Sequence, residues 1–178
     1  MVEKVKYEII KKIGKIEIRK YPELLLATVK NNVDDSGFEL LFKYISGENR
    51  TSKKINMTAP VITSENIPMT APVISKENYM AFVIPASYDK DNIPIPKNSD
   101  VIIKTEPAKC LGVIQFSGRT NFKLIEKYKK ELYDELKTNK LESVGEPILM
   151  RYNSPFMPGF LRRNEIAIEI INFEGCWW

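Results

Sequence analysis

The segment Ile16-Glu17-Ile18-Arg19-Lys20-Tyr21-Pro22 decides the fold class, because a related segment recurs as Val101-Ile102-Ile103-Lys104-Thr105-Glu106-Pro107. The two segments align at an offset of 85 residues (16 to 101), and the alignment continues without a gap to match Leu26 with Leu111. Each copy reads as a strand, a turn at the proline and a second strand. The sequence therefore predicts two related halves.

A helix is predicted after each strand pair. The first spans residues 35–46, carries an apolar face at helical spacing and ends before Gly47. The second spans residues 120–138, is capped by Thr120 or Asn121, and carries an apolar stripe of Phe122, Ile125, Tyr128 or Lys129, Leu132 and Leu136. Two more strands follow each helix, over residues 61–62 or 73–74 and 79–84 in the first half, and 148–152 and 165–171 in the second. This order predicts an α+β protein with two pseudo-symmetric ββαββ halves, joined by a linker over residues 85–96.

An exact repeat lies inside the first half. Met57-Thr58-Ala59-Pro60-Val61-Ile62 recurs letter for letter as Met69-Thr70-Ala71-Pro72-Val73-Ile74. Each copy predicts an extended segment, because proline pushes the residue before it out of the helical region and Val-Ile suits a sheet. The two copies are expected either to pair as neighbours or to line one wall of a cavity.

Composition indicates a single globular domain. The chain has 178 residues, 43% hydrophobic and 28% charged, with a net charge of +4 that is not gathered into a basic stripe. Nucleic acid is therefore not an expected partner. The apolar runs are too short to cross a bilayer and no signal peptide is visible, so we expect a cytoplasmic protein without a membrane partner. Two distant cysteines argue against a disulfide scaffold.

The chain contains no histidine, and this excludes several kinds of site. A Ser-His-Asp triad, a Cys-His nucleophile pair and a histidine-ligated haem all require that side chain. With only two cysteines, a four-ligand structural zinc site is excluded too. Conceivable iron ligands remain in Tyr44, Tyr152, Cys176 and the methionines, although methionine more commonly fills gaps in a core.

The chain resembles the SOUL/haem-binding protein family. The resemblance covers residues 7–171 and is carried by an ordered set of segments: 38–49, 54–61, the second Met-Thr-Ala-Pro-Val, Phe82-Val83-Ile84-Pro85, Phe116-Ser117-Gly118, 151–155 and 160–165. It implies one domain over residues 1–178, folded as a distorted antiparallel β-barrel flanked by two helices. The tail over residues 172–178 lies outside the resemblance, and its terminal Trp177-Trp178 is expected either to dock or to fray.

The resemblance also implies a ligand and its contacts. The ligand is haem or a related tetrapyrrole, held non-covalently on the first helix and on the loop before the last strand. Carried over by position, the contacts are Phe38, Leu41, Phe42, Lys43, Phe156, Met157, Phe160 and Arg162. Some family members have a basic residue where Met157 stands, so one propionate contact is in question. From spacing alone, the apolar residues of the first helix are equally explained by core packing.

Three functions follow from these observations. The first is a tetrapyrrole-binding protein, neither an enzyme nor a metal-site protein, acting as a monomer or weak dimer. The second is a sensor or sequestering module for other flat hydrophobic ligands, or a structural interaction protein. The third is an enzyme in which Glu39 or Glu165 acts with Tyr44 or Tyr152. The cluster Arg162-Arg163-Asn164-Glu165 is either an anion clamp or a structural network in which Glu165 pairs with an arginine.

Overall fold

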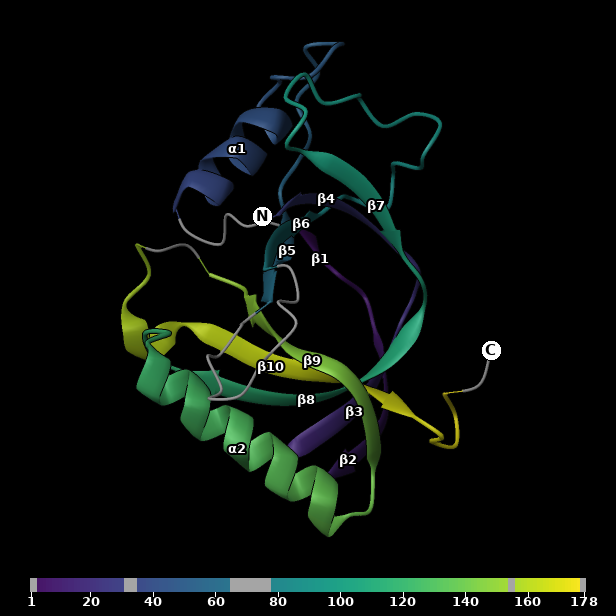
Figure 1. Ribbon diagram of the computed structural model, residues 1–178, viewed down its shortest axis with the longest axis vertical. Helices are drawn as coiled ribbons and strands as arrows, with labels where there is room; N and C mark the ends of the chain where they lie inside the picture. The colour runs from purple at the N-terminus through teal and green to yellow at the C-terminus, as the bar shows by residue number, and fades with distance from the viewer. Residues whose placement is uncertain (1–2, 31–34, 65–77, 154–155, 177–178) are drawn as a thin grey trace, which may run out of the picture. The chain divides into compact units, whose positions relative to one another are not determined.

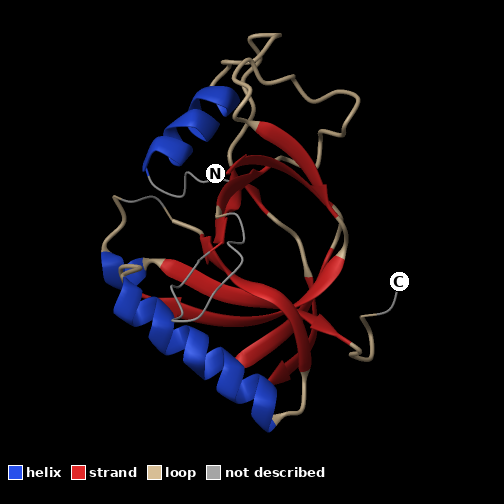
Figure 2. Cartoon of the chain, in the orientation of Figure 1, coloured by secondary structure: helices blue, strands red, loops and turns tan. Residues whose placement is uncertain are grey.

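The computed structural model describes residues 3–30, 35–64, 78–153 and 156–176. The chain divides into two compact units that interleave in sequence. Unit 1 contains Met1–Lys4 and Leu24–Glu106, and unit 2 contains Val5–Glu23 and Pro107–Trp178. Each unit combines antiparallel strands with one α-helix, so the predicted α+β class is confirmed (Figures 1 and 2).

Unit 1 is a four-stranded antiparallel sheet with the order β7-β4-β6-β5, and a short strand pairs in parallel with β5. Its elements are β1 (Glu3–Lys4), β4 (Leu24–Lys30), α1 (Asp35–Ile45), β5 (Thr58–Ser64), β6 (Tyr79–Val83) and β7 (Ile102–Glu106). The first copy of the exact repeat forms most of β5. The second copy, residues 69–74, lies outside the described residues, so the relation between the two copies stays a prediction.

Unit 2 is a five-stranded antiparallel sheet with the order β2-β3-β8-β10-β9. Its elements are β2 (Glu8–Ile13), β3 (Ile16–Tyr21), β8 (Lys109–Ser117), α2 (Phe122–Thr138), β9 (Glu142–Arg151), the 3₁₀ turn η1 (Gly159–Leu161) and β10 (Arg163–Ile171). In Figure 1, α2 lies along one face of this sheet. The strand β2 was not predicted, because its alternation Glu8-Ile9-Ile10-Lys11-Lys12 is imperfect.

The pairing register confirms the 85-residue repeat. In unit 2, β3 pairs with β8 so that Ile16 lies opposite Ile114. Shifting both positions by 85 gives Val101 and Val29, which continues the register of β7 on β4, where Ile102 lies opposite Thr28. One expectation is corrected: the first strand of each half pairs within the unit formed by the other half. The ββαββ order along the chain is therefore not the order of a packed unit.

Each unit has its own apolar core, made by its helix and one face of its sheet. In unit 2, Leu132 and Leu136 of α2 pack on Ile114 of β8 and Ile168 of β10. Asn121 caps α2, since its side chain accepts a hydrogen bond from the Leu124 N–H at 2.9 Å. Phe122, predicted to join the apolar stripe of α2, is instead 68% exposed. It is the first helical residue, and the buried stripe begins one turn later at Ile125.

A disulfide corrects the expectation drawn from the cysteine count. Cys110 of β8 is bonded to Cys176 near the C-terminus, across a sequence separation of 66. Sequence spacing could not reveal this pairing, because β8 and the tail meet only once the sheet has formed. The turn before Cys176 packs closely, since a Cβ added at Gly175 would lie 3.0 Å from Ile10. Trp177 and Trp178 lie outside the described residues.

Membrane-spanning segments were also considered. Among the described residues, no helix has both the length and the apolar character needed to cross a bilayer. The strand pairs within each unit form open sheets, so the predicted barrel closure is not part of this description.

Candidate functional site

The first group of predicted ligand contacts lies on α1 of unit 1. Leu41 is fully buried in the core, whereas Phe42 is 49% exposed. Phe38 lies between these two situations: its ring stacks on Phe42 at 6.1 Å between centroids and meets the edge of Phe82 at 5.2 Å. The exposed part of the helix face is therefore Phe42 backed by Phe38, and Leu41 supports it from within.

Lys43 is the predicted cation of this helix. Its Nζ lies 2.7 Å from Oε1 of Glu39, one turn earlier, and both side chains are more than half exposed. The hydrogen bond and charge of Glu39 raise the pKa of Lys43 above its ordinary value, so the lysine stays charged. The surface pair itself contributes little to stability, which leaves the ammonium able to exchange Glu39 for another anion.

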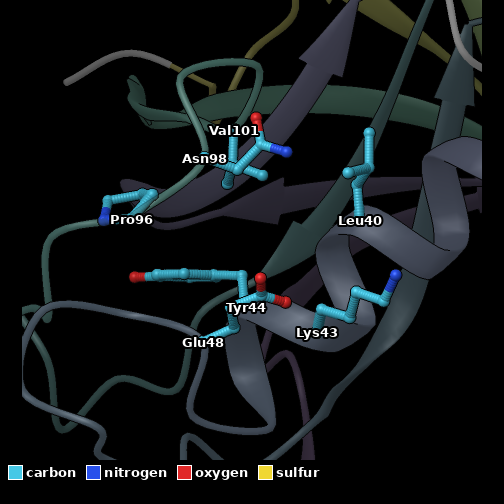
Figure 3. A pocket seen from close by; sticks show the side chains of 7 residues that line it. All are labelled: Leu40, Lys43, Tyr44, Glu48, Pro96, Asn98 and Val101. Carbon is cyan, nitrogen blue, oxygen red and sulfur yellow. The ribbon is translucent and has the colours of Figure 1, made fainter.

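A small pocket lies beside α1 (Figure 3). It has a volume of about 80 Å³ and is lined by Leu40, Lys43, Tyr44, Glu48, Pro96, Asn98 and Val101. The Tyr44 hydroxyl donates a 2.7 Å hydrogen bond to the Pro94 carbonyl, which fixes the ring between α1 and the 94–101 segment. Binding cavities for drug-sized ligands measure roughly 300–1,000 Å³. This pocket therefore cannot enclose a tetrapyrrole.

The second group of predicted contacts lies between β9 and β10 of unit 2. Phe156 is 96% exposed, Phe160 77% and Leu161 57%, while Met157 is more sheltered. Arg162 fastens the loop, since its Nε donates to the Met157 carbonyl at 2.7 Å. The loop thus presents large apolar side chains to solvent beside a guanidinium group, which is the combination expected for an amphiphilic ligand.

A buried charge network occupies the interior of unit 2, centred on Glu165 of β10. Both Glu165 and Arg19 of β3 are almost completely buried, at 0% and 2% exposure. Arg19 donates to both carboxylate oxygens, at 2.8 and 3.1 Å. Arg163 donates two more hydrogen bonds to Oε1, at 3.0 and 2.6 Å, and the Tyr152 hydroxyl donates one to Oε2 at 2.8 Å. The carboxylate is therefore saturated.

Tyrosine rings complete the network. The Arg19 guanidinium lies 4.4 Å from the Tyr7 ring centre, and the Arg163 guanidinium lies 4.4 Å from that of Tyr152. Burial raises the pKa of Tyr21 to about 12, although Arg19 acts in the opposite direction, and burial raises that of Tyr152 further. Burial alone would lower the pKa of Arg19, but the hydrogen bonds and charge of Glu165 raise it above its ordinary value.

This geometry bears on the enzyme hypothesis and on the reading of the Arg162–Glu165 cluster. Glu165 and Tyr152 do meet, as one hypothesis required, but the carboxylate has no position left for a substrate proton. Glu39, the other carboxylate considered, is exposed and paired with Lys43. The network reading of the cluster is confirmed, with Glu165 paired to two arginines.

The conceivable iron ligands are engaged elsewhere. The Tyr44 and Tyr152 hydroxyls donate to protein oxygens, and Cys176 is in the disulfide. Met80 and Met150 are buried in the cores. Sequence reasoning missed Tyr7, Arg19 and Tyr21 as members of the network. The available signal was the alternation of Ile16 and Ile18 with polar residues on a strand whose two faces are both covered.

Comparison with known proteins identifies the family. The model of the SOUL heme-binding protein family matches residues 2–169, nearly the whole chain. The protein therefore belongs to the SOUL heme-binding protein family. A comparison with curated protein sequences gives no match.

Solved structures with the same fold are distant in sequence. The C-terminal domain of EcmrR superposes with a TM-score of 0.63 at 11% identity, over 92% of this chain and 97% of that domain. A hydrolase from Listeria innocua gives a TM-score of 0.60 at 10% identity, over 90% and 94%. SAV2435 bound to tetraphenylphosphonium gives 0.51 at 10% identity, over 89% and 95%. At these identities the likeness concerns the fold alone.

Proposed function

We propose that this protein binds haem or a related tetrapyrrole non-covalently, without catalysing a reaction on it. Membership of the SOUL heme-binding protein family supports the ligand class. The observation that carries the proposal is the loop of unit 2, where Phe156 and Phe160 are largely exposed next to Arg162. The closure of both sheets into one distorted barrel, which the family resemblance implies, is part of the same proposal.

The chemistry of the loop suits a flat amphiphile. A tetrapyrrole has two apolar faces and two propionates, and exposed phenylalanine rings can cover a face while a guanidinium binds a carboxylate. On α1, Phe42 and Lys43 offer the same pair of chemistries. The chain has no histidine, so the iron receives no imidazole from it. Affinity is therefore expected to depend little on the metal.

The test is a titration of the purified protein with haem and with metal-free protoporphyrin IX, followed by absorbance and tryptophan fluorescence. Both pigments are expected to bind saturably with affinities within about fivefold, which corresponds to about 1 kcal/mol. Phe160→Ala and Phe42→Ala are each expected to weaken binding, while Val144→Ala and Ile102→Ala, at exposed apolar positions of the same units, leave it unchanged. Strict dependence on iron, or equal losses in the control variants, would contradict the proposal.

A second candidate is a receptor for other flat or cationic hydrophobic ligands. The specific observation is that SAV2435, which has the same fold, is bound to tetraphenylphosphonium. In this chain, Arg19 and Arg163 already occupy the Glu165 carboxylate and the faces of Tyr7 and Tyr152, so a cation would have to displace them. Competition by tetraphenylphosphonium against protoporphyrin would favour this candidate.

Location stays a prediction. The cytoplasmic expectation is in tension with the Cys110–Cys176 disulfide, because cytosolic thiols of most organisms are kept reduced. The expected monomer or weak dimer and the absence of a nucleic-acid partner likewise stay predictions.

A further inference from the structure

Unit 2 carries an exposed aromatic tip where the 156–161 loop meets the start of α2. The Gly118 N–H donates to the Gly159 carbonyl at 3.1 Å, and the Asn164 side chain donates to the Gly118 carbonyl at 2.9 Å. A Cβ added at Gly159 would lie 2.9 Å from Cγ of Arg119, so the loop packs directly on the turn that precedes α2. In Figure 1, η1 lies beside the first turn of α2.

The exposed apolar side chains gather at this tip. Phe156, Phe160 and Leu161 come from the loop, and Phe122 is the first residue of α2; all four are more than half exposed. Single exposed apolar side chains are ordinary on a protein surface, but a contiguous group of large ones marks an interaction site. Capping of α2 by Asn121 and the loop contacts above hold the group in place.

The charge around the tip has one sign. Residues 117–125 and 151–164 contain five basic residues and no aspartate or glutamate. Of these five, Arg163 is committed to Glu165, whereas Arg119 and Lys123 flank Phe122. The first carboxylate further along α2, Glu126, has its Oε1 buried in the protein. Exposed aromatic residues with a basic, acid-free border are complementary to an anionic lipid surface.

We propose that this tip, formed by Phe122, Phe156, Phe160 and Leu161 with Arg119 and Lys123, docks on the surface of an anionic lipid bilayer. The aromatic side chains enter the interface between headgroups and acyl chains, and the two cations bind the headgroups. The absence of a membrane partner was expected because no segment spans a bilayer, but surface docking needs no span. Phe156 and Phe160 also serve the proposed tetrapyrrole site, so the experiments must separate the two functions.

The experiment is flotation of the pigment-free protein with vesicles of phosphatidylcholine alone and of phosphatidylcholine with 30% phosphatidylserine. We expect at least tenfold tighter binding to the anionic vesicles, weakened severalfold between 0.1 and 0.5 M salt, because each basic residue contributes roughly fivefold at an anionic surface. Phe156→Ser with Phe160→Ser is expected to lose at least tenfold, and Arg119→Glu with Lys123→Glu to abolish the preference for phosphatidylserine. Val144→Ser, an exposed apolar position on β9, is the matched control.

Several outcomes overturn the proposal: no vesicle binding, equal binding to both vesicle types, or binding that survives the paired Phe→Ser variant. A concentration-dependent dimer that this variant abolishes, without vesicle binding, would identify a second copy of the chain as the occupant instead. Circular dichroism verifies that the variants are folded. Pigment titration without vesicles is a separate arm, so failure of the tetrapyrrole proposal and failure of membrane docking give different results.

Discussion

Replacing Glu165 by glutamine is expected to be among the most destabilising single changes in unit 2. The substitution keeps the shape of the side chain but removes the negative charge that faces two guanidinium groups. Arg19 is 2% exposed, so its charge would remain buried with only Glu17, at 2.8 Å from Nε, as a counter-charge. Breaking a buried ion pair by removing one partner costs about 3–5 kcal/mol. Because Glu17 compensates in part, we expect about 3 kcal/mol.

The network also predicts an order among the variants. Arg163→Met should cost less, about 1 kcal/mol, because Arg163 is 30% exposed and Glu165 keeps Arg19 and Tyr152. Arg19→Met should fall between the two. In the double variant Glu165→Gln with Arg19→Met, the loss should be smaller than the sum of the single losses by at least about 1 kcal/mol, since neither charge is left alone.

Urea unfolding followed by far-ultraviolet circular dichroism and by tryptophan fluorescence measures these differences, and agreement of the two probes tests whether the transition is two-state. A loss below about 1 kcal/mol for Glu165→Gln would refute the reasoning. So would a larger loss for Arg163→Met than for Glu165→Gln, because the exposed arginine would then carry the network.

Three further predictions concern other parts of the chain. Reduction of the Cys110–Cys176 disulfide should destabilise unit 2 by up to about 4 kcal/mol, from the loop-closure entropy of a 66-residue separation; dithiothreitol should lower the melting temperature of the wild type but not that of the Cys110→Ala, Cys176→Ala variant, and equal effects on both would disprove the assignment. Burial raises the pKa of Tyr21 and of Tyr44 to about 12. Between pH 10 and 12 the unfolded chain loses these protons while the folded chain keeps them, so the free energy of unfolding should fall by about 1.4 kcal/mol per pH unit for each tyrosine; a Tyr21→Phe variant with an unchanged slope would count against this. On α1, Leu41→Ala should cost about 2–5 kcal/mol in urea unfolding and Phe42→Ala less than about 1, because only Leu41 is fully buried; similar costs would mean that the helix faces are misassigned.

The helices and the repeat could be predicted from the sequence because both are local patterns. The second helix was predicted over residues 120–138 and is observed as Phe122–Thr138, with the Asn121 cap as one of the two alternatives. The offset of 85 residues was readable because strand, proline turn and strand recur in the same order. The observed register between Ile16 and Ile114 then follows that offset.

Pairings between distant segments could not be predicted in the same way. The exchange of first strands between the units, the disulfide and the Arg19–Glu165 pair each join residues separated by at least 66 positions. Nothing in the local pattern distinguishes Arg19, which is buried, from Lys20, its neighbour on the other face. The exposed loop presented the opposite difficulty, because Phe156 and Phe160 look like core residues until the fold leaves them outside.

The repeat shows where the two halves differ, and this difference restricts where specific function can lie. At an offset of 85, Arg19 corresponds to Lys104 and Tyr21 to Glu106. Lys104 pairs with Glu106 at 3.3 Å with its side chain 62% exposed, whereas Arg19 is buried against Glu165. A solvated pair of this kind contributes little to stability, but a buried one must be fully paired to be tolerated. The two halves therefore share their pairing register and differ in interior polarity. Because the buried network fixes the start of β10 through Arg163 and Glu165, it also fixes the end of the loop that carries Phe156 and Phe160. The charges that make unit 2 different thus hold in place the surface to which we assign binding.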